Sequence, residues 1–136
     1  MIKVQNTINA SIDKVWDLWT LPEHIMNWNI PFSDWHTPYV EYDLKVKGRF
    51  KFTMAAKDGT DGFDFEGIYT TIEKFSVIEY ELLDNRKASV HFEDKETSVK
   101  LTEIFEPETK NSEQMQEQFC RGVIQNFKEY VENNKQ

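Results

Sequence analysis

Residues 111–136 read NSEQMQEQFCRGVIQNFKEYVENNKQ, and their apolar side chains recur at helical spacing. On a helical wheel these side chains gather on one side, over an arc of about 180°. The members of this apolar arc are Met115, Phe119, Cys120, Val123, Ile124, Phe127, Tyr130 and Val131. A helix that lies on a flat surface needs an apolar stripe of only about 100°. The width of the arc therefore predicts a long helix with a curved wall around it.

The segments before this helix have the pattern of strands that could form such a wall. Polar and apolar residues alternate at residues 2–8, which is typical of a strand with one buried face. The same alternation predicts further strands at residues 39–44, 49–54, 63–75, 78–82, 88–93 and 99–105. Short connections between them indicate an antiparallel sheet. A sheet of seven twisted strands curls, so we expect it to surround the helix.

Two short helices are predicted between the first strand and the others. Ser11 is a suitable N-cap for a helix that carries apolar residues up to Trp19. Residues 20–23 fit a capping box with a proline in the first turn, and this second helix should end near Pro31. Asn111 or Ser112 caps the long helix. The prediction is a single α+β domain over residues 1–136.

Composition restricts the classes of function. The chain has 136 residues and a formal net charge of −8, which argues against nonspecific binding to nucleic acid or to anionic membranes. No apolar run reaches the length of about 18 residues that a membrane span needs, and the first residues do not resemble a signal peptide. The single cysteine, Cys120, is expected to be a buried structural thiol. A reducing cytoplasm is the expected compartment.

Several motifs along the chain together resemble one family. They lie at residues 10–16, 20–24 with Trp28, 43–52, 58–59, 67–69, 78–80 and 98–102. In this order they resemble START-like proteins, and most of all the branch named after the activator of heat shock protein 90 ATPase. The resemblance covers essentially the whole chain. It implies a helix-grip fold, in which the sheet grips the C-terminal helix and often encloses an apolar cavity. Relatives bind lipids, hormones or polyketides, some are enzymes, and the namesake stimulates a chaperone.

One position departs from the family pattern. The family often has Gly-Trp in the last helix, whereas here Gly122 is followed by Val123. The smaller side chain would widen a cavity at that level, unless Phe119 fills the space. The candidate cavity-lining residues are Trp28, Trp35, His36, Tyr42, Phe50, Phe52, Phe65, Tyr80, Glu103, Phe119, Val123, Asn126 and Phe127. The alternative is that these side chains pack against one another in a filled core.

Glu103 is the most informative polar residue. Strict alternation places it on the inward face of its strand, together with Leu101 and Phe105. An inward carboxyl group would have a raised pKa and could orient a polar group of a ligand or act as a base. A β-bulge, or a place at the rim of the sheet, would instead turn it outward. Gln116 and Asn126 are further polar candidates within the apolar arc, although buried amides more often bond the neighbouring backbone.

The other polar clusters predict no metal site. His24, His36 and His91 lack metal-ligand spacing. We expect His24 at a helix surface and His91 on an outward strand face. His36, between Trp35 and Tyr39, is a candidate for the mouth of the cavity, and the alternative is that it does not face the cavity. The acidic residues between positions 58 and 66 fail the calcium-loop template and instead indicate a hairpin turn. No cofactor is predicted.

Four cations form a stripe at strand spacing. These residues are Lys45, Lys47, Arg49 and Lys51. They are expected to pair with Glu41, Asp64 or Glu66 across the strands, and docking of an acidic partner is the alternative.

Three functions are compatible with these observations. The favoured one is non-enzymatic binding of a small hydrophobic or amphipathic molecule between the sheet and the last helix. The second is an enzyme, such as a cyclase or a hydrolase, that uses Glu103 or His36 as a general base. The third is a protein-interaction module that stimulates a chaperone. No catalytic triad, phosphate loop or nucleotide motif appears, so no catalytic residue is assigned.

Overall fold

The computed structural model describes residues 1–30 and 33–133. Its elements follow the predicted order of one strand, two short helices, six strands and one long helix. They are β1 (Ile2–Ile8), α1 (Ile12–Thr20), α2 (Pro22–Trp28), β2 (Trp35–Tyr42), β3 (Arg49–Ala56), β4 (Gly62–Glu73), β5 (Val77–Leu82), β6 (Lys87–Asp94), β7 (Val99–Phe105) and α3 (Glu113–Asn133). The fold is α+β, with the helix-grip arrangement.

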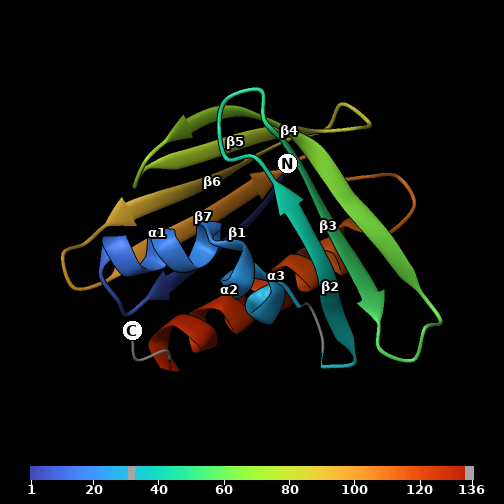
Figure 1. Ribbon diagram of the computed structural model, residues 1–136, viewed down its shortest axis with the longest axis horizontal. Coiled ribbons are helices and arrows are strands. Elements are labelled where there is room, and N and C mark those ends of the chain that lie inside the picture. The colour runs from blue at the N-terminus through green and yellow to red at the C-terminus, as the bar shows by residue number, and fades with distance from the viewer. Residues whose placement is uncertain (31–32, 134–136) are drawn as a thin grey trace.

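All strands form one antiparallel sheet of seven strands in the order β1-β7-β6-β5-β4-β3-β2. From β2 onward each strand pairs with the next strand in the chain, whereas β1 lies at the far edge beside β7. Helices α1 and α2 carry the chain from one edge strand to the other. The sheet arches over α3, and all three helices lie on the same side of it (Figure 1). The predicted curved wall is thus confirmed.

The apolar arc of α3 is buried over most of its length. Val123, Ile124, Phe127 and Val131 belong to the hydrophobic core, together with inward side chains of the strands. The prediction that Met115 packs against the wall is wrong, because this residue is 57% exposed. Helical spacing shows the side of a helix on which a residue lies, but it does not show how far along the helix the wall extends.

Serine caps begin the two longer helices. The Oγ atom of Ser11 accepts a hydrogen bond from the backbone N of Lys14 at 3.4 Å, as expected for the N-cap of α1. The Oγ atom of Ser112 accepts one from the backbone N of Met115 at 3.1 Å. Of the two predicted caps for the long helix, the structure therefore uses the serine.

The capping box predicted for the second helix is wrong. Thr20 is the last residue of α1, and its hydroxyl donates to the backbone O of Trp16 at 2.7 Å. The N-cap of α2 is Leu21, which makes no side-chain cap hydrogen bond. Helix α2 ends at Trp28, and the predicted end near Pro31 lies outside the described residues. The threonine bonds backward because one helix follows the other after a single residue.

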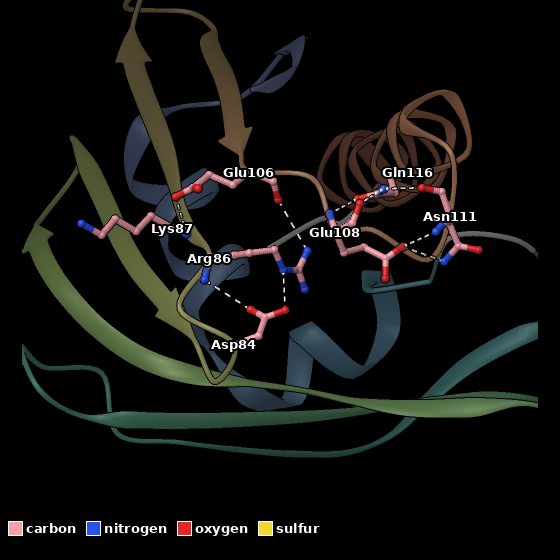
Figure 2. Close-up of polar contacts among 7 residues, drawn as sticks. All are labelled: Asp84, Arg86, Lys87, Glu106, Glu108, Asn111 and Gln116. Carbon is pink, nitrogen blue, oxygen red and sulfur yellow. Dashed lines mark hydrogen bonds and ion pairs between the residues drawn. The ribbon is translucent and has the colours of Figure 1, made fainter.

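Polar contacts join two loops at one end of the sheet (Figure 2). In the turn between β5 and β6, Arg86 Nε donates to Asp84 Oδ2 at 2.7 Å. Its Nη1 atom reaches the backbone O of Glu106, just after β7, at 3.5 Å. The carboxylate of Glu106 in turn accepts from the backbone N of Lys87 at 3.0 Å. These contacts hold the connection from β7 to α3 against the sheet.

The same connection is held from the helix side by Gln116. Its Oε1 atom accepts from the backbone N of Glu108 at 2.9 Å, and its Nε2 atom donates to the backbone O of Asn111 at 2.9 Å (Figure 2). The alternative that this amide satisfies neighbouring backbone is confirmed, so it does not serve as a polar group of a cavity.

Candidate ligand-binding cavity

A cavity of about 80 Å³ lies between the sheet and the helices. It is much smaller than the roughly 300 Å³ at which pockets for drug-sized ligands begin. The core is therefore neither completely filled nor widely hollow.

Part of the predicted lining surrounds this cavity. The predicted residues that line it are Trp28, Phe50, Phe52, Phe65, Tyr80, Glu103 and Val123. Residues that the sequence analysis did not single out complete the wall: Trp19, Thr20, Ile25, Asn29, Leu44, Tyr69, Ile78 and Val90. Strand alternation carries a signal for Tyr69, Ile78 and Val90. The pattern around Asn29 carries no such signal, because this residue lies between a helix and a strand.

Two predicted residues line a different surface. Trp35 and Asn126 lie at a broad, open depression of about 560 Å³ that residues of α2, β2 and α3 line. The Nδ2 atom of Asn126 donates to the backbone O of Ile30. Its amide thus joins α3 to the segment after α2. This is the alternative in which a buried amide bonds backbone rather than a ligand.

Phe127 and Phe119 also lie outside the cavity lining. Phe127 is fully buried and packs edge-on against Trp19 and Trp28, with ring centroids 4.9 and 4.8 Å apart. Phe119 is half-buried and faces Trp35 and Phe63, at centroid distances of 6.4 and 5.9 Å.

Tyr42 and His36 lie on the edge strand β2, and neither lines the cavity. Burial raises the pKa of the Tyr42 hydroxyl to about 12, with a smaller contribution from the charge of Glu23. Because Glu103 lies in the cavity and His36 does not, the two candidate bases do not share a site.

Glu103 points into the cavity. The register between β1 and β7 is continuous from Ile2↔Phe105 to Ile8↔Val99, so no bulge turns the residue outward. Its neighbours in register, Val4 and Val90, are both buried. Of the alternatives that the sequence left open, the structure therefore has the inward position given by strict alternation.

The carboxyl group of Glu103 accepts two hydrogen bonds. The Tyr80 hydroxyl donates to Oε1 at 3.2 Å, and the Cys120 thiol donates to Oε2 at 2.9 Å. Burial raises the pKa of Glu103 above its ordinary value of 4.5, while these two hydrogen bonds oppose the rise. Among the described residues, no cationic side chain forms an ion pair with it.

The two donors are themselves weak acids in this environment. Burial, and next the neighbouring Glu103, raise the pKa of Tyr80 and of Cys120. The thiol therefore stays protonated and donates. This confirms the expectation that Cys120 is a buried structural thiol.

Asn29 presents a further polar group to the cavity. It is the C-cap residue of α2, and its side chain is 8% exposed. Its backbone O accepts from the Thr37 hydroxyl at 2.5 Å. The Nδ2 atom, in contrast, is buried and has no hydrogen-bond partner among the residues that the structure describes. Buried polar atoms are rarely left unpaired, so this donor needs an explanation.

Aromatic rings form the wall on the sheet side. Phe50 packs against Tyr80 and Phe65, with ring centroids 5.2 and 5.6 Å apart, and Phe65 lies 5.8 Å from Tyr80. Gly67 makes this possible, because a Cβ atom there would lie 2.9 Å from the Phe50 ring. Three rings from β3, β4 and β5 thus line the space that Glu103 enters.

The remaining charged groups lie away from the cavity. The prediction that His24 lies at a helix surface is wrong, because the residue is buried. Its Nδ1 atom lies 2.5 Å from the Tyr130 hydroxyl on α3. The side of α2 that carries it faces α3. His91 is exposed, as predicted, and its Nε2 atom lies 2.9 Å from the Ser89 Oγ atom. Within the described ranges, no group of three or more His, Cys, Asp or Glu is placed to hold a metal ion.

The basic stripe forms the expected cross-strand pairs at one residue. Lys51 Nζ lies 3.7 Å from Asp64 and 3.8 Å from Glu66 on the neighbouring strand.

Over the described part of the chain, no helix is both long and apolar enough to cross a membrane.

Comparison with known proteins places this geometry in a family. A family profile described as "Activator of Hsp90 ATPase homolog 1-like protein" matches residues 9–133. The solution structure of an AHSA1-like protein from Aeromonas hydrophila is 38% identical, with a TM-score of 0.86 over 96% of this chain and 92% of that chain. A protein from Cytophaga hutchinsonii is 40% identical, with a TM-score of 0.83 over 98% and 92%.

A more distant structure shares the fold alone. A protein from Chromobacterium violaceum is 15% identical, with a TM-score of 0.86 over 98% of both chains. Among curated proteins, the comparison finds no match.

Proposed function

We propose that this chain, which belongs to the activator of Hsp90 ATPase homolog 1-like family, binds a small amphipathic molecule between its sheet and α3 without converting it. The observation that carries the proposal is the composition of the cavity wall. Aromatic and aliphatic side chains supply most of it, while Glu103 and Asn29 supply polar groups. A core that served stability alone would gain nothing from an unpaired amide, because a buried polar atom without a partner costs free energy.

The size of the cavity limits the ligand. A volume of about 80 Å³ admits a compact molecule, or one compact part of a larger molecule. A ligand with both apolar and polar groups fits this wall better than a purely hydrophobic one, because Asn29 would otherwise stay unpaired on binding.

A cavity-filling variant tests the proposal. Val123→Phe adds a ring at the helix side of the cavity, and Val46→Phe adds the same ring at a side chain that is 51% exposed. Both variants and the parent chain are screened against a library of compact amphipathic compounds, by thermal shift and by ¹H–¹⁵N NMR. We expect bound compounds to raise the Tm of the parent and of Val46→Phe, but not of Val123→Phe.

Circular dichroism checks that each variant is folded, since overpacking costs about 1–3 kcal/mol. Val123→Leu replaces Val123→Phe if the larger ring prevents folding. Compounds that bind the Val123→Phe variant as tightly as the parent would contradict the proposed place of binding. A screen without any binder would contradict the function.

A second candidate function is stimulation of a chaperone ATPase, which the description of the family names. The supporting observation is an exposed aromatic group beside the start of α3. Phe63 is 41% exposed and contacts both Trp35 and Phe119. We expect the chain to raise the ATPase rate of an Hsp90 chaperone and Phe63→Ser to reduce the effect. An unchanged rate with the parent chain would exclude this function.

A further inference from the structure

We infer that the ligand of the cavity is a compact amine whose ammonium group is held by Glu103 and the surrounding aromatic rings, and whose hydrogen-bond acceptor is held by Asn29. The inference rests on the proposed function, because it names the class of ligand for the same cavity. Three independent features of the wall support it: a carboxyl group and an amide donor that lack a counter-charge and a partner among the described residues, and a set of ring faces.

The first feature is the charge of the wall. Within the described part of the chain, Glu103 accepts hydrogen bonds from Tyr80 and Cys120, and neither donor carries a positive charge. A carboxylate has about four acceptor positions, so about two remain for N–H groups of a ligand. A buried carboxylate without a counter-charge is costly, and an ammonium group would supply that charge. The formal net charge of −8 also attracts cations from solution.

The second feature is the set of rings. Phe50, Phe65 and Tyr80 line the same space as Glu103. The face of an aromatic ring attracts a cation within about 6 Å of its centroid, and more strongly where water is excluded. An anionic ligand would gain nothing from these faces and would be repelled by Glu103. The wall therefore selects for positive charge over negative charge.

The third feature is Asn29. Its Nδ2 atom is a buried donor that lines the cavity and lacks a partner among the described residues. A hydroxyl or carbonyl oxygen of the ligand would satisfy it. With a cavity of about 80 Å³, the ammonium group and this oxygen belong to one short molecule, such as a small amino alcohol.

Three small probes of similar size test the inference. The probes are 2-aminoethanol, ethane-1,2-diol and glycolate, which carry a cationic, a neutral and an anionic group beside a hydroxyl. Each is titrated against the full chain, and ¹H–¹⁵N NMR follows the side-chain amide of Asn29 and the backbone amides of β7. We expect 2-aminoethanol to shift these signals with at least tenfold tighter binding than ethane-1,2-diol, and glycolate to leave them unchanged.

A matched pair of variants assigns the effect to Glu103. Glu103→Gln should weaken the binding of 2-aminoethanol at least tenfold and leave the weak binding of ethane-1,2-diol unchanged. Glu79→Gln should change neither, because Glu79 is adjacent in sequence to Tyr80 and lies on the other face of β5.

A pH titration of the parent chain gives a second measurement, which holds even if Glu103→Gln does not fold. Burial raises the pKa of Glu103, so the affinity for 2-aminoethanol should fall as pH is lowered through that pKa, by up to tenfold per pH unit. Of the groups that face Glu103, Tyr80 and Cys120 stay protonated in this range because their pKa values are raised. The affinity for ethane-1,2-diol should not depend on pH.

The outcomes separate this inference from the function on which it rests. Equal binding of 2-aminoethanol and ethane-1,2-diol would overturn the inference that the ligand is an amine, but not the proposal that the cavity binds a ligand. If none of the three probes binds, the inference that the ligand is an amine is also overturned. The proposed function itself fails only if the wider screen finds no compound that binds the chain.

Discussion

The two halves of α3 face different surroundings. In the C-terminal half, Ile124, Phe127 and Val131 are fully buried against β1, α1 and α2. In the N-terminal half, Met115 is exposed and Cys120 bonds a carboxyl group. One continuous helix thus carries an apolar anchor at one end and a partly polar contact at the other. The comparison indicates that the anchor stabilises the fold, whereas the other half contacts the carboxyl group that enters the cavity.

The largest effect is expected from the anchor. Phe127→Ala removes a fully buried ring that packs against Trp19 and Trp28. We expect the free energy of unfolding to fall by about 3–5 kcal/mol, measured by urea denaturation. Met115→Ala on the same helix is the control and should change it by less than about 0.5 kcal/mol. Similar losses from both variants would remove the distinction between the two halves.

A smaller and pH-dependent effect is expected from Glu103→Gln. Burial raises the pKa of this carboxyl group in the folded state above 4.5, so the folded chain holds the proton more tightly than the unfolded chain. Its contribution to stability is present below the unfolded pKa and is lost as pH rises through the folded pKa. The loss is about 1.4 kcal/mol for each unit by which the pKa is raised.

The measurement for Glu103→Gln is the free energy of unfolding at a series of pH values above 4. The parent chain should lose stability over this window and the variant should not, so the difference between them grows with pH. Glu79→Gln is the control and should retain the slope of the parent. A Glu103→Gln variant with the slope of the parent would show that this carboxyl group is not shielded from water.

The contact between α2 and the anchored half of α3 gives the next effect. Tyr130→Phe removes the hydroxyl that lies 2.5 Å from His24 Nδ1. We expect the free energy of unfolding to fall by about 1 kcal/mol, because the ring still packs and only the hydrogen bond is lost. A double-mutant cycle with His24→Phe should give a coupling free energy of similar size. A coupling near zero would show that this contact does not join the two helices.

The smallest effect is expected where α3 begins. Gln116→Ala removes hydrogen bonds to the backbone of Glu108 and Asn111 (Figure 2). Stability should fall by less than about 1 kcal/mol, while amide hydrogen exchange in residues 106–112 becomes faster. Gln114→Ala, at an exposed position of the same helix, should leave the exchange unchanged. Faster exchange at the core strands as well would contradict a local role.

Much of the cavity wall was predictable because strand geometry is strictly periodic. Alternation decides the face of each residue directly, so it placed Phe50, Tyr80 and Glu103 inward before any contact was known. The predictions for Phe119, Trp35 and Met115 assumed that a residue on the right face also reaches the cavity. That distance along the helix or strand depends on where the opposing elements end.

His24 and Asn29 show a different limit. A helical wheel for a helix as short as α2 has too few apolar positions to define its buried side, so His24 was assigned to the surface. Asn29 is buried because the chain returns to form β2, where Thr37 donates to its backbone. Neither environment is visible in local spacing.

Local patterns in the chain were thus enough for the order of the elements, the inward faces of the strands and the need for a curved wall. The place where that wall ends, and the polar groups left without partners inside it, depended on the folded arrangement. Cys120 and Glu103 meet across 17 residues of sequence, and Asn29 faces a space bounded by every layer of the fold. Such contacts arise from distances between segments, which periodicity within one segment does not encode.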